Sequence, residues 1–350
     1  MIRLGRFPAG NLVLAAVCVA GFLTWRHENP AAPVAADRVL QRRGLADESR
    51  CVECHVEAES FGETGHARTL SRASSPASLD LLRQFAASSQ AAAENLTLET
   101  YAGGVRVVGK TGGVRRELDL DWCFGSGHHA RTWVGLLKDS WGSTDQVEFR
   151  WSWYDAIDGF ALTPGHPTDA DGGYFATLGL LFDHPKTRRC FACHATSMSL
   201  HEGRLDTEAI LPGVTCQRCH GPRADHVASE GEVRSTPLSS LDQQESVDRC
   251  AQCHRRADEL ETERIVPDNP ELARFQPVGL TQSRCFTQSE MTCVTCHDPH
   301  LPLEAQDSLG IWQCIQCHDS AVADHTTCAA GQTTGCIRCH MPKVQGENPL

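Results

Sequence analysis

The chain has 350 residues, a formal net charge of −12 and 18 cysteines. The acidic balance argues against a nucleic-acid partner, because proteins that bind nucleic acids carry basic patches. It favours encounter with a protein that presents a basic surface. So high a cysteine content is typical of exported proteins, since reducing compartments keep thiols reduced.

Residues 1–40 are expected to form a signal anchor and a linker. Arg3 and Arg6 precede an apolar run over 12–25, and Arg26 and a Pro/Ala-rich stretch follow it. This is the pattern of an export signal. The run is shorter than the about 20 residues of a usual membrane span. A cleaved signal peptide and an uncleaved anchor both remain open, and we favour the anchor. The rest of the chain is then expected on the periplasmic side of a bacterial membrane.

Residues 41–185 are predicted to form a first segment with a helix and a small antiparallel β insertion. A helix is expected over 75–96, with Ser75 as its cap and Pro76 in its first turn. The β insertion is expected near 97–163, because β-branched and aromatic residues alternate there around turn residues. Its expected strands are Val105–Val108, Val114–Trp122, Arg131–Leu137 and Val147–Tyr154, with a turn over 110–113.

Seven Cys-x-x-Cys pairs occur, and each is followed at once by His. The first stands alone in the first segment, and the other six lie in residues 186–350, the expected second segment. The motifs are Cys51–Cys54–His55, Cys190–Cys193–His194, Cys216–Cys219–His220, Cys250–Cys253–His254, Cys293–Cys296–His297, Cys314–Cys317–His318 and Cys336–Cys339–His340.

This motif is the attachment signature of c-type haem. On a helical turn, residues three and four apart share a face. The two thiols can therefore reach one porphyrin edge while the His coordinates the iron. Seven covalently bound haem groups are predicted. Zinc and plain disulfides are the alternatives, but neither requires a His after each pair. A thioredoxin-like site is disfavoured, because no βαβ pattern surrounds the motifs.

Six motifs between 190 and 340 leave little chain for a conventional apolar core. The predicted fold is therefore mainly α, with little regular secondary structure, organised around stacked haems. A helix over 240–250, capped by Ser239 or Ser240, is expected to lead into its motif.

The second axial ligand decides between an electron carrier and a haem that binds substrate. Ten histidines lie outside the motifs, and His27 is set aside because it borders the apolar run. His66, His226, His300 and His325 are the preferred distal ligands. One of His128 and His129 is expected to ligate, and His201 is a further candidate, with His166 and His184 behind it. The count leaves open whether one iron lacks a second ligand.

Two stretches carry a resemblance: Cys190-Phe-Ala-Cys-His194 and Gly213-Val-Thr-Cys-Gln-Arg-Cys-His-Gly-Pro222 with His226. They resemble the tetrahaem cytochrome c of nitrifying bacteria, the electron acceptor of hydroxylamine oxidoreductase. Thr64-Gly65-His66-Ala67 and the segment Phe124–His129 look like parts of the same domain. The resemblance implies stacked and perpendicular haem pairs, mostly with two His ligands. Carried over by position, it gives His66, His129, His226, His300 and His325 as distal ligands.

The chain departs from that family in having seven motifs instead of four. It also has no Cys-x-x-Cys-Lys motif, so the lysine-ligated haem of pentahaem nitrite reductases is not expected. No Tyr lies near the last motif, unlike the cross-linked haem of hydroxylamine oxidoreductase. Of the cysteines outside the motifs, Cys123, Cys285 and Cys328 are expected to give one disulfide and one free thiol, with a thiolate ligand as the alternative.

The sequence therefore predicts a periplasmic heptahaem electron-transfer protein, working between a donor and an acceptor protein. The anchor is consistent with a subunit of a larger membrane complex. The alternative is a multihaem oxidoreductase that acts on a small nitrogen or sulfur compound at one open haem. A non-redox haem or metal-binding module is a third reading.

Overall fold

The computed structural model describes residues 44–56, 59–111, 113–138, 144–169, 175–201, 204–266, 269, 272, 275–318 and 335–340. The predicted anchor, His325 and Cys328 lie outside these residues. Within them, no helix combines the length and the apolar character that crossing a bilayer requires.

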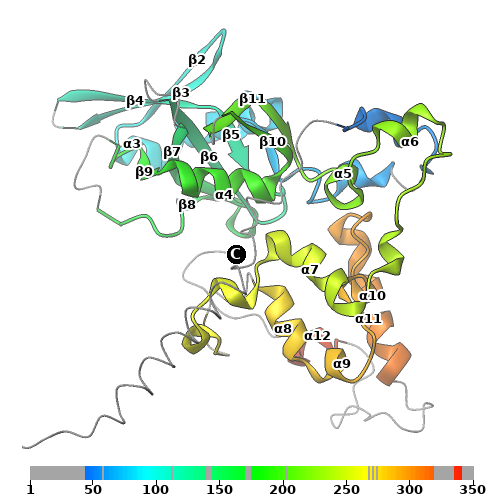
Figure 1. Ribbon diagram of the computed structural model, residues 1–350. Coiled ribbons are helices and arrows are strands. Elements are labelled where there is room, and N and C mark those ends of the chain that lie inside the picture. Colours follow the sequence, from blue (N-terminus) through cyan, green and yellow to red (C-terminus); the bar gives the residue numbers. More distant parts are fainter. Residues whose placement is uncertain are drawn as a thin grey trace, which may run out of the picture.

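Three antiparallel sheets occupy the part of the chain before residue 213 (Figure 1). Their strands are β1 (Leu70–Arg72), β2 (Thr97–Tyr101), β3 (Gly104–Thr111), β4 (Val114–Leu120), β5 (Trp122–Phe124), β6 (Ala130–Lys138), β7 (Thr144–Tyr154), β8 (Gly159–Leu162), β9 (Gly179–Phe182), β10 (Ala195–His201) and β11 (Arg204–Pro212).

The prediction of a mainly α fold with one small β insertion is wrong, because 27% of the structure is strand beside 40% helix. Three of the four strands expected from alternation lie within β3, β6 and β7, and the fourth, Val114–Trp122, is divided at Asp121 into β4 and the start of β5. The strands β10 and β11 were missed because they directly follow the second motif. That segment alternates small polar residues with apolar ones, but it lies between two haem motifs, where only a connector is expected. The second motif therefore borders an ordinary apolar core.

The largest sheet has the order β1-β5-β6-β7-β8, and β9 also pairs with β7. The long strand β7 serves both neighbours, because its first half pairs with β9 and its second half with β8. Buried aromatic residues of this sheet form the centre of the apolar core, among them Trp122, Trp133, Phe149 and Trp153. These tryptophans therefore belong to the apolar core.

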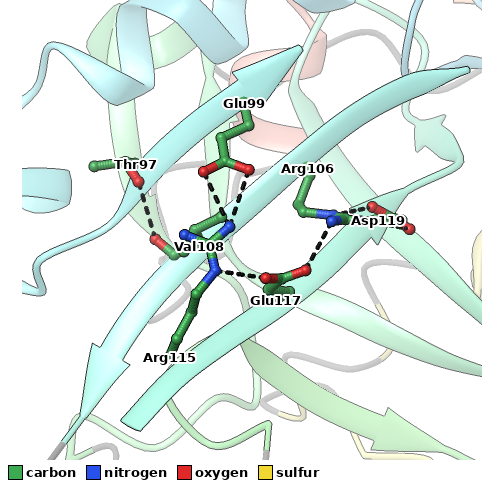
Figure 2. A network of polar contacts seen from close by, with 7 residues as sticks. All are labelled: Thr97, Glu99, Arg106, Val108, Arg115, Glu117 and Asp119. Atoms are coloured by element: carbon green, nitrogen blue, oxygen red, sulfur yellow. Dashed lines mark hydrogen bonds and ion pairs between the residues drawn. The ribbon is translucent and has the colours of Figure 1, made fainter. Parts of the chain in front are cut away.

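The three-stranded sheet β2-β3-β4 separates polar and apolar residues onto opposite faces. Val105, Val107 and Leu118 are buried. On the other face, Arg106 pairs with Glu117 and Asp119, and Arg115 pairs with Glu99 and Glu117 (Figure 2). These pairs are exposed, so each contributes little to stability. Their alternation fixes the register, since a slip by one residue would exchange the two faces.

Two helices cover the core where one was expected. α2 (Pro76–Ala86) starts as predicted, with Pro at its first position, and α3 (Ser89–Ala93) follows after a break. Ser88 causes the break, since its side chain caps α3 by accepting from the Ala91 N–H. Phe85 of α2 is 2% exposed and lies edge-on to Phe149 and Phe160.

The remaining chain consists of helices and connectors (Figure 1). The helices are α4 (His184–His194), α5 (Cys216–His220), α6 (Ala224–Ala228), α7 (Gln243–His254), α8 (Gln276–Gln282), α9 (Arg284–Thr287), α10 (Cys293–Cys296), α11 (Leu303–His318) and α12 (Ile337–His340). The helix expected over 240–250 exists, but Asp242 caps it in a capping box with Glu245. Short 3-10 turns cover Glu48–Arg50, Ser60–Glu63, Asp155–Ile157, Leu238–Ser240, Ala257–Glu259 and Thr262–Arg264.

Helix α4 joins the sheets to the helical part of the chain, because it packs on the largest sheet and ends in the second motif. Its Phe191 is fully buried and lies edge-on to Trp122 and Phe124. Met198, Leu205 and other residues of β10 and β11 complete the apolar cluster around Phe191.

Candidate haem centres

Each motif sits on a helical turn. In the first, fifth and seventh motifs, the His N–H donates to the carbonyl of the first Cys at 3.0 Å. The second, third, fourth and sixth motifs form the last turns of α4, α5, α7 and α11. The turn places both thiols and the imidazole on one side of the helix, as haem attachment requires.

Among the described residues, His55, His220 and His254 of the motifs each face a second imidazole. His55 faces His226 with ring centres 6.3 Å apart. His254 faces His66 at 6.1 Å, and His220 faces His300 at 6.1 Å. The two ring planes are 28° apart in the first pair, 88° apart in the second and 21° apart in the third.

These separations agree with a shared iron. With metal–nitrogen bonds of about 2 Å and about 1 Å from nitrogen to ring centre, two axial imidazoles stand about 6 Å apart. The three pairs can therefore hold the first, third and fourth haems.

Hydrogen bonds at Nδ1 leave Nε2 available in several of these rings. His226 donates through Nδ1 to the Val233 carbonyl at 2.9 Å, and His300 to Asp298 at 3.0 Å. The motif histidine His194 donates to the Thr69 carbonyl at 3.2 Å. A metal-bound His commonly donates its other nitrogen in this way, which fixes the tautomer and the ring.

Burial also favours the neutral imidazole, which is the form that binds metal. It lowers the pKa of His66, His194, His220 and His254, because the charged form loses hydration. Around His220, the neighbouring His300 lowers the pKa further.

The other predicted ligands have different surroundings. His129 is exposed, and the side chain of His201, at the end of β10, is not among those described. His166 is buried with its Nε2 3.2 Å from Glu148. His184 opens α4.

The motif histidine His194 has an aromatic neighbour. Its ring lies 5.1 Å from the ring of Phe124. His128 contacts Glu304 at 3.3 Å.

Thiols of different motifs lie next to one another. Cys51 and Cys216 lie with Glu48 in a group whose donor atoms are within 4.8 Å. Cys193 lies beside Cys253, and Cys250 lies beside Cys293. The first motif thus neighbours the third, and the fourth neighbours the second and fifth.

The same group argues against zinc. It offers three donors, whereas structural zinc sites take four. Burial and the nearby Glu48 raise the pKa of the Cys216 thiol to about 12.

A comparison with protein families bears on the same segment. Residues 177–221 match the family described as cytochrome c554 and c-prime. The match supports a c-type cytochrome. Such proteins carry covalently bound haem c and take part in electron transfer. The matched residues include the second and third motifs, so the resemblance noted in the sequence is confirmed at this level. No curated protein and no solved structure matches the chain.

The sequence identified the six rings of the three pairs but not which rings face each other. It also missed Glu304, since a Glu in the first turn of a helix is ordinary. No local signal gives either result, because each contact joins segments far apart in the chain.

Proposed function

We propose that the chain is a heptahaem electron carrier of the periplasmic side, in which most irons have two His ligands. The observation that carries this proposal is the set of three facing imidazole pairs at iron spacing. Two tight protein ligands leave no position for a substrate, so such a centre only transfers electrons. Haem, when bound, supplies the one-electron couple, whose potential axial ligands tune over about 0.8 V.

The contacts between motifs support a continuous path. Helix α7, with the fourth motif, packs against α4 and α10, which carry the second and fifth motifs. Arg218 of the third motif reaches the same helix, donating to Gln252 at 3.1 Å. The fourth motif thus stands next to three others. Short steps between neighbouring centres would then replace one long step.

The partners of this carrier would be a donor and an acceptor protein. The net charge of −12 favours partners with basic surfaces. The N-terminal signal would place the chain on the periplasmic side and hold it near a membrane complex.

An optical spectrum with an intact mass tests the proposal. We expect a mass that includes seven haems, a low-spin spectrum in both redox states and no shift when carbon monoxide is added to the reduced protein. Fewer than seven haems would contradict the heptahaem assignment. High-spin iron at several centres would contradict the carrier.

One observation favours the alternative of an enzyme with an open haem. The ring beside the imidazole of His194 is that of Phe124, which has no atom to bind iron. A multihaem oxidoreductase of a small nitrogen or sulfur compound would use such an iron. Carbon monoxide binding to about one haem equivalent of the unmodified protein would favour this function.

A further inference from the structure

The loop between β5 and β6 presents two adjacent histidines with opposite surroundings. His129 is exposed, and its carbonyl accepts from the Asp155 N–H at 3.0 Å. The side chain of His128 is only 18% exposed. Its Nε2 is buried and has no hydrogen-bond partner among the described residues.

The loop is built to hold this arrangement. Gly125 has φ +130°, and a Cβ there would lie 2.0 Å from the Ala130 carbonyl oxygen. Gly127 has φ +85°. Only glycine adopts such conformations without strain. The Ser126 hydroxyl also accepts from the His128 N–H at 3.4 Å.

Glu304 holds the other nitrogen of the ring. Its Oε1 lies 3.3 Å from His128 Nδ1 as an ion-pair contact, whereas Nε2 has no partner among the described residues. This is the carboxylate–histidine arrangement that orients metal ligands. A buried, unpartnered nitrogen lowers stability unless something binds it, and this one is free to bind a metal.

The position of the ring points to one motif. His128 lies beside Gly65, whose neighbour His66 already faces His254 of the fourth motif. Glu304 stands in the first turn of α11, which packs on α10 of the fifth motif. Two nearby motifs are already occupied beside their His: the fourth by the imidazole of His66, and the second by the ring of Phe124, 5.1 Å from His194. The fifth motif, next to α11, has no ring assigned beside its His.

We propose that His128 Nε2 is the second axial ligand of the fifth-motif iron, opposite His297, and that Glu304 is its positioning residue. The proposal rests on the proposed function, because it requires haem at the fifth motif. It assigns to His128, and not to its neighbour His129, the ligand that the sequence left undecided between the two.

The first experiment replaces His128 by Ala, with His129→Ala as the matched control. We expect His128→Ala to bind one more equivalent of carbon monoxide than the unmodified protein, with one new high-spin centre and an unchanged intact mass. His129→Ala should match the unmodified protein. Added imidazole should restore the low-spin spectrum of His128→Gly. An unchanged carbon monoxide count in His128→Ala would overturn the proposal.

A second set of variants identifies the iron. His297→Ala and His128→Ala should each expose one iron, and the double variant should also expose only one, because both residues bind the same iron. Two additional equivalents in the double variant would show that His128 serves another haem and would overturn the assignment. If His297→Ala lowers the mass by one haem, adding His128→Ala should then have no spectral effect.

Glu304→Gln tests the positioning role. The amide has nearly the same size as the carboxylate but carries no charge, so the ring should stay bound while the imidazole becomes less electron-rich. We expect a low-spin protein in which the potential of one centre rises. Unchanged potentials at all centres would contradict the role of Glu304. An intact mass of the unmodified protein that includes no haem would contradict the proposed function itself and not this inference.

Discussion

The rings of His66 and His254 face each other with their planes 88° apart, whereas those of His220 and His300 are 21° apart. Perpendicular axial imidazoles leave two iron d orbitals nearly equal in energy, and near-parallel imidazoles separate them. We therefore expect two kinds of low-spin EPR signal in the oxidised protein: one highly anisotropic and one rhombic.

Replacing His66 by Ala should remove the anisotropic signal and retain the rhombic ones. EPR of the oxidised variant measures this, with His129→Ala as the control because that ring is exposed. Loss of a rhombic signal instead would mean that His66 belongs to a different iron.

Gly213 should control the same centre through the backbone. It has φ +77°, and a Cβ there would lie 2.3 Å from the Ala67 carbonyl oxygen. The next residue, Val214, donates to the His66 carbonyl at 2.9 Å. Gly213→Ala should therefore displace His66, weaken the anisotropic signal and lower the melting temperature.

Gly113→Ala is the matched control for this change. Gly113 has nearly the same φ, +79°, but no atom lies within 4 Å of a Cβ built there. The Gly113→Ala variant should lose only about 1–2 kcal/mol of stability, from the strain of a left-handed backbone. Its EPR spectrum should be unchanged. Equal spectra for the two variants would contradict the backbone link to His66.

Phe85→Ala should destabilise the sheet region by about 3–5 kcal/mol. Phe85 is 2% exposed, and its ring centre is 5.2 Å from Phe149 and 5.1 Å from Phe160. Denaturant unfolding followed by tryptophan fluorescence would measure the loss. Leu181→Ala is the control, because Leu181 is 55% exposed. A similar small effect for both variants would contradict the packing described.

The two described cysteines outside the motifs should differ in reactivity. Both are free, but Cys123 is buried and Cys285 is exposed. Burial raises the pKa of the Cys123 thiol to about 11, so its reactive thiolate is scarce at neutral pH and increases as pH rises.

Peptide mapping after alkylation at pH 7 should find Cys285 modified and Cys123 protected. Denaturant should make the two equally reactive. Rapid labelling of Cys123 in the folded protein would show that the core around it is open. The predicted disulfide is not formed between Cys123 and Cys285, since both are free. Cys328, the third cysteine of that prediction, lies outside the described residues.

The sequence predicted the local features well. The seven motifs, the hairpin of β3 and β4 and the start of α2 follow from residue chemistry over a few positions. The sheets β10–β11 and the pairing of His66 with His254 did not, because they depend on contacts between distant segments. The assumption that haems replace an apolar core failed at Phe191, which lies inside the second motif and is fully buried in an apolar cluster.

The facing pairs have a consequence for how the protein is made. His55 and His66 precede their partners, His226 and His254, by most of the sheet region. Under the proposed function, a first haem attached as the chain is exported would bind before its second ligand, His226, has crossed the membrane. Nearby histidines then have time to bind the iron wrongly. Maturation should therefore be limited by the exchange of such ligands, and by the slow formation of distant contacts.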